Sequence, residues 1–332
     1  MDDGRVLEGR GWSSVGDPEA WFGPATSVGY LQPGRIMPVY LAFPRPVPAE
    51  LRREYGQDDW ECISDVLAAF GVPADARWVI EPGGPAVPVV ACLPHGGLDF
   101  PAGLADTLAV SPEILWSDWL TRELYAFLPE LGITAITTTF SRFVADVNRD
   151  PSAEQHGGFW TSVVAARMPN GRAVYQRPLT QTEIRHRILL AHTPFHQALD
   201  RVIERLLLRF PRVLLLDLHS FGAGLDGDVI LGDRRGVTAR PAAVRLLVGA
   251  LATAGLDVRL NQRFAGGWTV RRFAGHEQVD AVQVELNQRR YLDLERRRYP
   301  GPPPLGAFDA TQRLLRLALA DVAAQVISGL GG

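Results

Sequence analysis

Two histidines closely follow long apolar segments of the chain. His95 comes after residues 87–93 (VPVVACL), and His219 comes after residues 213–218 (VLLLDL). An unbroken apolar run is typical of a strand covered on both faces, so each histidine is predicted at the end of a buried strand. Neutral imidazole is the commonest metal ligand, and the glycines after each histidine leave room for a metal and its water. The pair therefore indicates a metal site, although a lone histidine at a strand end is more often a hydrogen-bonded structural residue.

Further polar residues lie near the ends of other predicted strands. Glu285 is close to the end of residues 281–286 (AVQVEL), and SRFVADVNRDP, which follows residues 133–138, holds Arg142, Asp146, Asn148 and Arg149. A glutamate on the inner face of a core strand is either a general base or the buried partner of an arginine. Each arginine guanidinium is a planar fork that suits a substrate carboxylate. The alternative is that the arginines are surface charges and that Asp146 pairs with one of them.

The remaining histidines are predicted to lie outside the metal site. His192 and His196 have the HxxxH spacing of a helical metal site, but Thr193 as a helix cap and Pro194 in the first turn place His192 before the helix. Asp217, two residues before His219, is on the same face of its strand and is expected to accept the second imidazole N–H, or to pair with an arginine. Three more histidines are expected at the surface: His156, His186 and His276.

The elements that position these residues alternate between strands and helices. Strands are predicted over residues 37–43, 87–93, 133–138, 213–218, 229–231, 257–260 and 281–286, and helices over 58–70, 111–130, 193–210, 238–254 and 309–327. This pattern predicts an α/β fold with a mostly parallel mixed sheet flanked by helices, whose chemistry lies at the carboxyl ends of the strands. Residues 1–86 are expected to form a small N-terminal α+β extension of unknown role, and residues 87–332 the catalytic domain.

Composition excludes several classes of protein. The 332 residues carry a formal net charge of −3, which gives no electrostatic case for binding nucleic acid or a membrane surface. All 34 basic residues are arginine, so P-loop NTPases, protein kinases and pyridoxal-phosphate enzymes, which need a lysine, are excluded. The acidic, polar N-terminus gives no reason to expect a signal segment, and no membrane span is expected because the apolar runs are too short. With Cys62 and Cys92 expected to be reduced and buried, a cytoplasmic location is predicted.

Eight short motifs in order add a family resemblance: PHGGLDFP, SDWLTRELYAF, SRFVADVNRDP, TPFHQAL, LLLDLHS, VILGDRRG, NQRFAGGWTVRRF and VQVELNQRRYLD. The chain resembles the N-formylglutamate amidohydrolase family over about residues 87–300. The resemblance implies a fold similar to the zinc carboxypeptidases and one Zn²⁺ per chain, held by His95, His219 and Asp118 of SDW. Asp99, closer to His95 in the sequence, is the alternative acidic ligand.

The resemblance also implies roles for the other polar residues. Glu285 and Arg142 are the expected catalytic residues, and substrate binding is expected from four others: Arg149, Asn148, Thr269 and Arg271. Two positions depart from the family pattern, since Gly96 stands where serine is usual and Trp116 where a second aspartate is usual. Residues 1–86 match nothing in the family.

The leading hypothesis is a zinc-dependent amidohydrolase that cleaves a linear amide bond of an N-acyl amino acid similar to N-formylglutamate. The expected partner is a small-molecule or peptide substrate that carries a carboxylate, and the oligomeric state is left open. Two alternatives remain: a carboxypeptidase-like peptide hydrolase with the same metal site, and a binding protein that has kept the fold without turnover.

Overall fold

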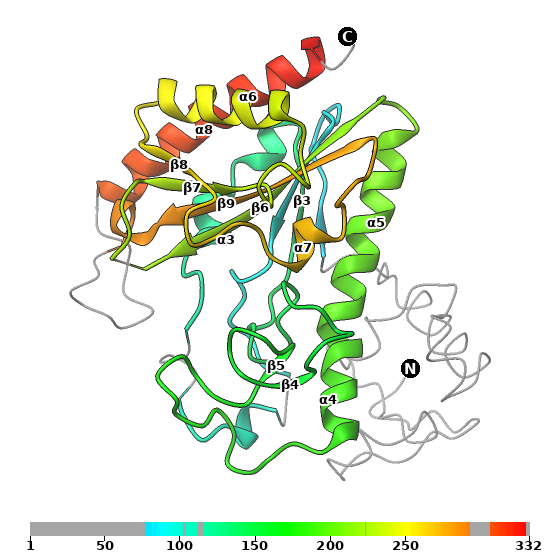
Figure 1. Cartoon of the computed structure of the whole chain (residues 1–332), viewed down its shortest axis with the longest axis vertical. Coiled ribbons are helices and arrows are strands. Elements are labelled where there is room, and N and C mark those ends of the chain that lie inside the picture. The colour runs from blue at the N-terminus through cyan, green and yellow to red at the C-terminus, as the bar shows by residue number, and fades with distance from the viewer. Residues whose placement is uncertain (1–77, 102–103, 112–115, 223, 293–305, 330–332) are drawn as a thin grey trace, which may run out of the picture.

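A computed structural model describes residues 78–101, 104–111, 116–222, 224–292 and 306–329, and shows a mixed sheet between layers of helix (Figure 1). The strands are β1 (Val79–Ile80), β2 (Val89–Leu93), β3 (Thr134–Thr137), β4 (His156–Gly157), β5 (Val164–Ala165), β6 (Val213–Phe221), β7 (Val229–Gly232), β8 (Val258–Leu260) and β9 (Val279–Asn287). The α-helices are α3 (Thr121–Leu124), α4 (Gln181–Arg187), α5 (Thr193–Leu207), α6 (Pro241–Thr253), α7 (Trp268–Arg271) and α8 (Ala307–Gly329). Single turns of 3-10 helix are η3 (Ala105–Thr107), η5 (Leu128–Leu131) and η7 (Gln288–Arg290), and a π-helical turn, η6 (Ile188–His192), joins α4 to α5.

The main sheet has the strand order β1-β3-β2-β6-β9-β7-β8. Its four central strands, β3, β2, β6 and β9, are parallel to one another, while β1 pairs antiparallel with β3 and β7 pairs antiparallel with β9. After β2 the chain first adds β3 on one side and later β6 on the other. The strand order therefore reverses at β2, and in open α/β sheets such a switch point is where ligands bind.

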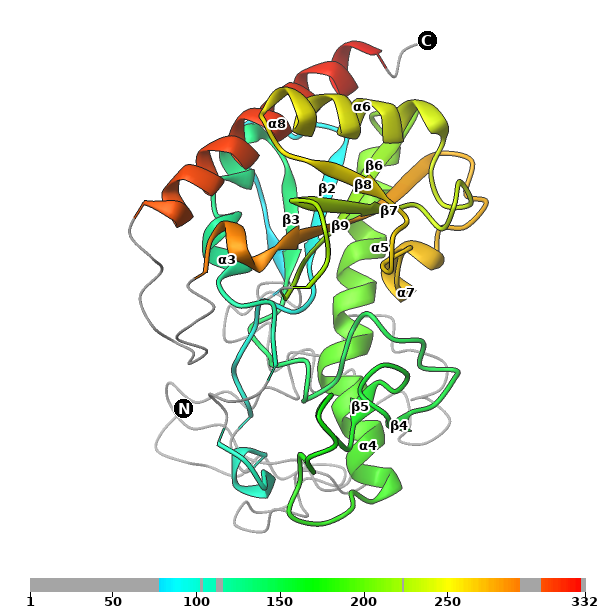
Figure 2. The same ribbon diagram turned by 60° about the vertical axis from the view of Figure 1, so that its left-hand side comes forward.

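Alternate residues of the central strands enter two separate apolar cores. Val90, Cys92 and Leu215 face the core that also contains residues of α5, whereas Val89 and Leu216 face the core shared with α6 and α8. Figures 1 and 2 show α6 and α8 together on one side of the sheet and the long α4–α5 run on the other. Because both faces are covered, the central strands are largely apolar, which explains why they are recognisable in the sequence.

Most predicted elements within the described residues are confirmed. The strands near residues 87–93, 133–138, 213–218, 229–231, 257–260 and 281–286 correspond to β2, β3, β6, β7, β8 and β9, and the helices near 238–254 and 309–327 to α6 and α8. Cys92 is buried and unpaired. The predicted strand 37–43, the predicted helix 58–70 and Cys62 lie outside the described residues. None of the helices that the structure describes is both long and apolar enough to cross a membrane.

The continuous helix predicted over residues 111–130 is wrong. The chain from Trp116 to Leu120 is not helical, and only the short α3 and η5 follow it. Two contacts divert this segment: the Ser117 hydroxyl donates to the His95 carbonyl oxygen at 2.5 Å, and the Asp118 N–H donates to the same oxygen at 3.2 Å. Leu120 then adopts a left-handed backbone, with φ at 60°, which ends any helical path before α3.

The start predicted for the helix after residue 193 is also wrong. Helical backbone already begins at α4, and Thr193 makes no capping bond because His192 before it is itself helical. Thr180 provides the N-terminal cap instead, in a capping box with Glu183. His186 on α4 is buried rather than at the surface, whereas His276 is exposed as predicted and His156 is half-buried.

Candidate metal centre

The parallel pairing of β2 and β6 brings the two predicted histidines together. Cys92 near the end of β2 lies opposite Asp217 in β6, so His95 just beyond β2 comes to lie beside His219. Both rings are buried, and their centroids are 4.7 Å apart at an angle of 63°. His219 lies within β6, whose backbone pairs with β9, whereas His95 lies two residues beyond β2, where Ser117 and Asp118 bind its carbonyl oxygen.

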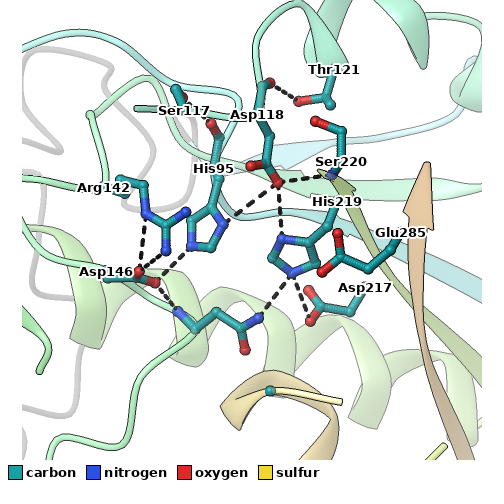
Figure 3. Close-up of polar contacts among 12 residues, drawn as sticks. His95, Ser117, Asp118, Thr121, Arg142, Asp146, Asp217, His219, Ser220 and Glu285 are labelled. Atoms are coloured by element: carbon teal, nitrogen blue, oxygen red, sulfur yellow. Dashed lines mark hydrogen bonds and ion pairs between the residues drawn. The ribbon is translucent and has the colours of Figure 1, made fainter. Parts of the chain in front are cut away.

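Asp118 is the third member of this cluster. Its Oδ2 atom lies 3.0 Å from Nδ1 of His219 and 3.6 Å from Nδ1 of His95, and it accepts the Ser220 backbone N–H at 3.1 Å (Figure 3). One ligand atom from each of the three buried residues lies within 4.8 Å of the other two. Asp99, the alternative ligand, is exposed and lies outside this cluster.

Each imidazole is also held through its other nitrogen by a second carboxylate. Nε2 of His95 lies 2.6 Å from Oδ1 of Asp146, and Nε2 of His219 lies 3.0 Å from Oδ2 of Asp217. The predicted contact between Asp217 and His219 is therefore present. A carboxylate on the far nitrogen fixes the tautomer and the orientation of a metal-binding histidine.

The donor set fits a cation. Both imidazoles turn Nδ1 toward Oδ2 of Asp118 and Nε2 toward a second carboxylate. A cation held by His95, Asp118 and His219 would take the place of a proton on the Nδ1 side and leave each imidazole neutral, which is the form that binds metals. A pair of imidazole nitrogens with one carboxylate oxygen is a donor set that suits zinc.

The electrostatics keep the Asp118 carboxyl ionised. Burial raises the pKa of the Asp118 carboxyl, but hydrogen bonds from His219 and His95 outweigh burial and hold that pKa well below its usual range. Burial also raises the pKa of the Asp146 carboxyl, but the positive charges of Arg142 and Arg149 outweigh burial and lower that pKa. For His219, burial lowers the pKa, but the charge of Asp217 and the bond to Asp118 raise it above the ordinary value.

Glu285 lies beside the cluster on the adjacent strand β9. It is buried, its carboxylate points toward the His219 ring in Figure 3, and its Oε1 accepts a hydrogen bond from Nε2 of Gln283 at 2.6 Å. Burial is the largest influence on Glu285 and raises its pKa to about 7, although the positive charge of His219 opposes this. A carboxylate with a pKa near neutrality can both accept and return a proton.

The two arginines of the SRFVADVNRDP segment have different surroundings. Arg142 is buried and binds Asp146 through Nε and Nη2, and its guanidinium lies 4.4 Å from the centroid of Phe159. Arg149 is less constrained: Nη1 donates to the Asn148 carbonyl oxygen at 2.9 Å, Nη2 donates to the Phe159 carbonyl oxygen at 3.4 Å and lies 3.6 Å from Asp146, and Nε has no partner among the described residues. The fork of Arg142 is therefore used to hold Asp146, whereas Arg149 keeps donor capacity.

The other predicted binding residues divide into one group at the cluster and one away from it. The side-chain amide of Asn148 lies 2.9 Å from Nε2 of His219, and its Oδ1 accepts the Thr269 backbone N–H at 2.9 Å. Arg271 instead is exposed and forms an ion pair with Asp150. Asn148 thus contacts the cluster directly and Thr269 contacts it through Asn148, whereas Arg271 binds Asp150 instead.

Sequence reasoning missed the roles of two polar residues in this centre. Asp146 was interpreted as an arginine partner, yet it also binds His95, which lies 51 positions earlier. Gln283 donates to Glu285 and accepts the Gly267 backbone N–H at 2.6 Å. The alternation of β9 could have indicated Gln283, because it lies on the same face as Glu285. No local signal reveals the contact of Asp146 with His95.

The two departures from the family pattern are close in sequence to His95 and Asp118: Gly96 follows His95, and Trp116 is two residues before Asp118. A Cβ atom at Gly96 would come within 2.6 Å of Cγ of Arg122, so the Arg122 side chain occupies the space that a serine there would need. Trp116 has 49% of its surface exposed.

The fold and the cluster define a mixed α/β protein with a candidate metal centre at the ends of parallel strands. A model of the N-formylglutamate amidohydrolase family matches residues 87–292, more than half of the chain, so the chain belongs to that family. An N-formylglutamate deformylase from Pseudomonas aeruginosa is 33% identical over 221 residues, which is 62% of this chain and 83% of that protein. One from Pseudomonas putida is 32% identical over 220 residues, 62% of this chain and 82% of that protein.

A solved structure agrees with the sequence relatives. The N-formylglutamate amidohydrolase of Ralstonia eutropha JMP134 superposes with a TM-score of 0.66 at 28% identity, covering 76% of this chain and 98% of that one. The gene product Atu2144 from Agrobacterium tumefaciens, at 18% identity and a TM-score of 0.58, shares the fold over 78% of this chain and 98% of its own. This chain is accordingly a hydrolase that acts on a non-peptide amide bond.

Proposed function

We propose that the protein is a zinc-dependent deformylase that hydrolyses N-formylglutamate, or a closely related N-formyl amino acid with an acidic side chain, to formate and the free amino acid. The buried cluster of His95, Asp118 and His219, with Glu285 beside it, carries this proposal. The names of the two Pseudomonas relatives and of the Ralstonia structure support the choice of substrate.

His95, Asp118 and His219 would hold the zinc ion, with Asp146 and Asp217 orienting the imidazoles from behind. When bound, the ion supplies Lewis acidity, which lowers the pKa of a water molecule and polarises the formyl carbonyl. Two nitrogen ligands and one carboxylate leave the open coordination position that distinguishes catalytic from structural zinc sites.

Glu285 would transfer the proton. It accepts a proton from the attacking water and delivers it to the amide nitrogen as the C–N bond breaks, so that the amine leaves in its neutral form. Gln283 fixes the orientation of the Glu285 carboxylate through its hydrogen bond. Since the pKa of Glu285 is about 7 without a cation, a zinc ion close by would lower it and so increase the ionised fraction at neutral pH.

Arg149 would bind a carboxylate of the substrate. Its side chain lies next to Asn148 at the cluster, and a guanidinium with free donors can hold a carboxylate through two parallel hydrogen bonds. Arg142, which the sequence indicated as catalytic, would act by holding Asp146 against His95.

The test is a measurement of zinc content and formate release on the purified full-length protein. We expect about one zinc per chain and release of formate from N-formyl-L-glutamate. N-formyl-L-glutamine and N-acetyl-L-glutamate separate the requirement for the side-chain carboxylate from the requirement for the formyl group. A zinc-loaded protein that leaves all three substrates intact would refute the proposal.

A further inference from the structure

Two buried histidines outside the metal cluster contact the chain segment that supports it. His192, at the end of the π-helical turn η6, and His196, in the first turns of α5, are one helical turn apart, and their ring centroids are 4.6 Å from each other. Nε2 of His192 lies 2.8 Å from the Arg149 carbonyl oxygen, and Nε2 of His196 lies 2.7 Å from the Val147 carbonyl oxygen. Both rings therefore face the backbone of residues 147–149.

The protonation of His196 follows from its other neighbour. Nη1 of Arg272 lies 2.8 Å from Nδ1 of His196, and Nη2 of Arg272 binds both carboxylate oxygens of Asp200 at 2.9 and 2.7 Å. Arginine has only donors, so Nδ1 accepts and Nε2 must carry the proton that is donated to Val147. Asp200, Arg272, His196 and the Val147 carbonyl thus form one continuous chain of hydrogen bonds.

The segment that these histidines hold carries two side chains of the metal centre. Asp146 precedes Val147 and binds His95, while Asn148 follows it and lies against His219. The Val147 carbonyl is thus located between the backbone units from which these two side chains extend. A displacement of this carbonyl changes the position of both side chains.

We propose that His192 and His196 are positioning residues, which act through the Arg149 and Val147 carbonyls to hold Asp146 and Asn148 against the imidazoles of His95 and His219. The π-helical turn belongs to this arrangement, because turns of this kind within α-helices are frequent at functional sites. The effect on catalysis rests on the proposed zinc-dependent function, but the positioning itself is a property of the protein without substrate.

The experiment compares two substitutions at one position. His196→Leu fills the site without a donor, whereas the side-chain amide of His196→Gln can still donate to the Val147 carbonyl. Arg272→Gln leaves His196 in place and removes the ion pair behind it. The matched control is Arg240→Gln, since Arg240 also binds a single carboxylate, that of Asp280, through Nε and Nη2, but at the start of α6 and β9. Zinc affinity by chelator competition, kcat, KM and Tm are measured for each variant.

Loss of the donor should weaken zinc binding and kcat by roughly 10–100-fold, as loss of an outer partner of a metal ligand usually does. His196→Gln should retain most of the zinc affinity and most of kcat. Arg272→Gln should lose part of the zinc affinity, whereas Arg240→Gln should keep the wild-type zinc affinity. Crystal structures of the metal-free variants should show the contact between Asp146 and His95 broken in His196→Leu and kept in His196→Gln.

Two results would overturn the proposal: equal losses in His196→Leu and His196→Gln, or unchanged zinc affinity and kcat in both. If His196→Leu does not fold, the comparison of Arg272→Gln with Arg240→Gln decides, and equal zinc affinities would count against positioning. Failure of the proposed function is a separate outcome: a wild-type protein that binds zinc and releases no formate refutes the deformylase, while the zinc affinities of the variants still test positioning.

Discussion

His219 lies directly opposite Glu285 in the parallel pairing of β6 with β9. The two side chains come from central strands of the sheet, so hydrogen bonds along both strands fix the distance between a proposed metal ligand and a proposed base. Such a fixed pair needs no rearrangement of the backbone before reaction, which is the condition for effective acid–base catalysis.

Replacement of Glu285 by glutamine should separate metal binding from proton transfer. Glutamine keeps the shape of the side chain but cannot accept a proton, so kcat should fall by roughly 10²–10⁴-fold. Zinc content should stay at the wild-type value, because Glu285 is not a proposed ligand. Turnover and zinc are measured on the same preparation; full activity would remove Glu285 from the mechanism, and joint loss of zinc would make it a ligand.

Asp118→Asn should lower zinc affinity far more than Asp99→Asn. Asp118 is buried between two imidazoles, whereas Asp99 is exposed, so the second substitution makes the same chemical change without touching the cluster. We expect the loss at Asp118 to exceed the roughly 10–100-fold that an outer partner costs. Chelator competition measures both affinities, and a larger loss at Asp99 would reverse the assignment.

Arg149→Lys should affect substrate binding more than metal binding. Lysine keeps the positive charge but loses the planar fork, so a bidentate contact with a substrate carboxylate should weaken. The expected result is a higher KM for acidic substrates, with kcat and zinc content changed little. Steady-state kinetics with N-formyl-L-glutamate measure this, and an unchanged KM would return Arg149 to a structural role.

Two glycine-to-alanine substitutions should differ in effect, because a side chain at Gly267 would collide with Asn148 whereas one at Gly249 would meet nothing. A Cβ at Gly267 would lie 2.4–2.6 Å from side-chain atoms of Asn148, so Gly267→Ala should displace Asn148 from His219 and reduce kcat. Gly249, within α6, has open space at the same position, and Gly249→Ala should stabilise the protein by about 0.5–1 kcal/mol. Equal kcat in the two variants would show that the Asn148 contact does not matter.

The capping box at the start of α4 predicts a pH dependence of stability. Burial raises the pKa of the Glu183 carboxyl, but hydrogen bonds from Arg177 and Thr180 outweigh burial and lower the pKa to about 2. Because this folded-state pKa is below the unfolded value, the stabilisation is complete above about pH 4.5 and is lost as the pH falls toward 2.

Denaturant unfolding of wild type and Glu183→Gln tests this prediction. The difference in the free energy of unfolding should be largest at neutral pH and should shrink below pH 4.5, whereas a constant difference would contradict the assignment. Thr180→Ala removes the other half of the capping box and should cost about 1 kcal/mol.

The sequence by itself determined the sheet and the residues that lie on it. β2 and the first half of β6 are unbroken apolar runs because both of their faces are covered, and His95 and His219 follow those runs. Glu285 is recognisable from the alternation of β9. Local patterns of this kind reflect burial at each position, and they need no knowledge of distant neighbours. The motifs around them were sufficient to indicate the family.

Only the tertiary structure decided how the remaining groups reach the site. Asp118 lies in a non-helical segment because Ser117, 22 positions after His95, and Asp118 both bind the His95 carbonyl oxygen, and these contacts override the local helical pattern. His192 and His196 were set aside from the sequence, yet the continuous helical run turns both toward the segment that carries Asp146 and Asn148. Contacts between distant segments leave no periodicity in the sequence, since their free energy is gained only when the chain is folded.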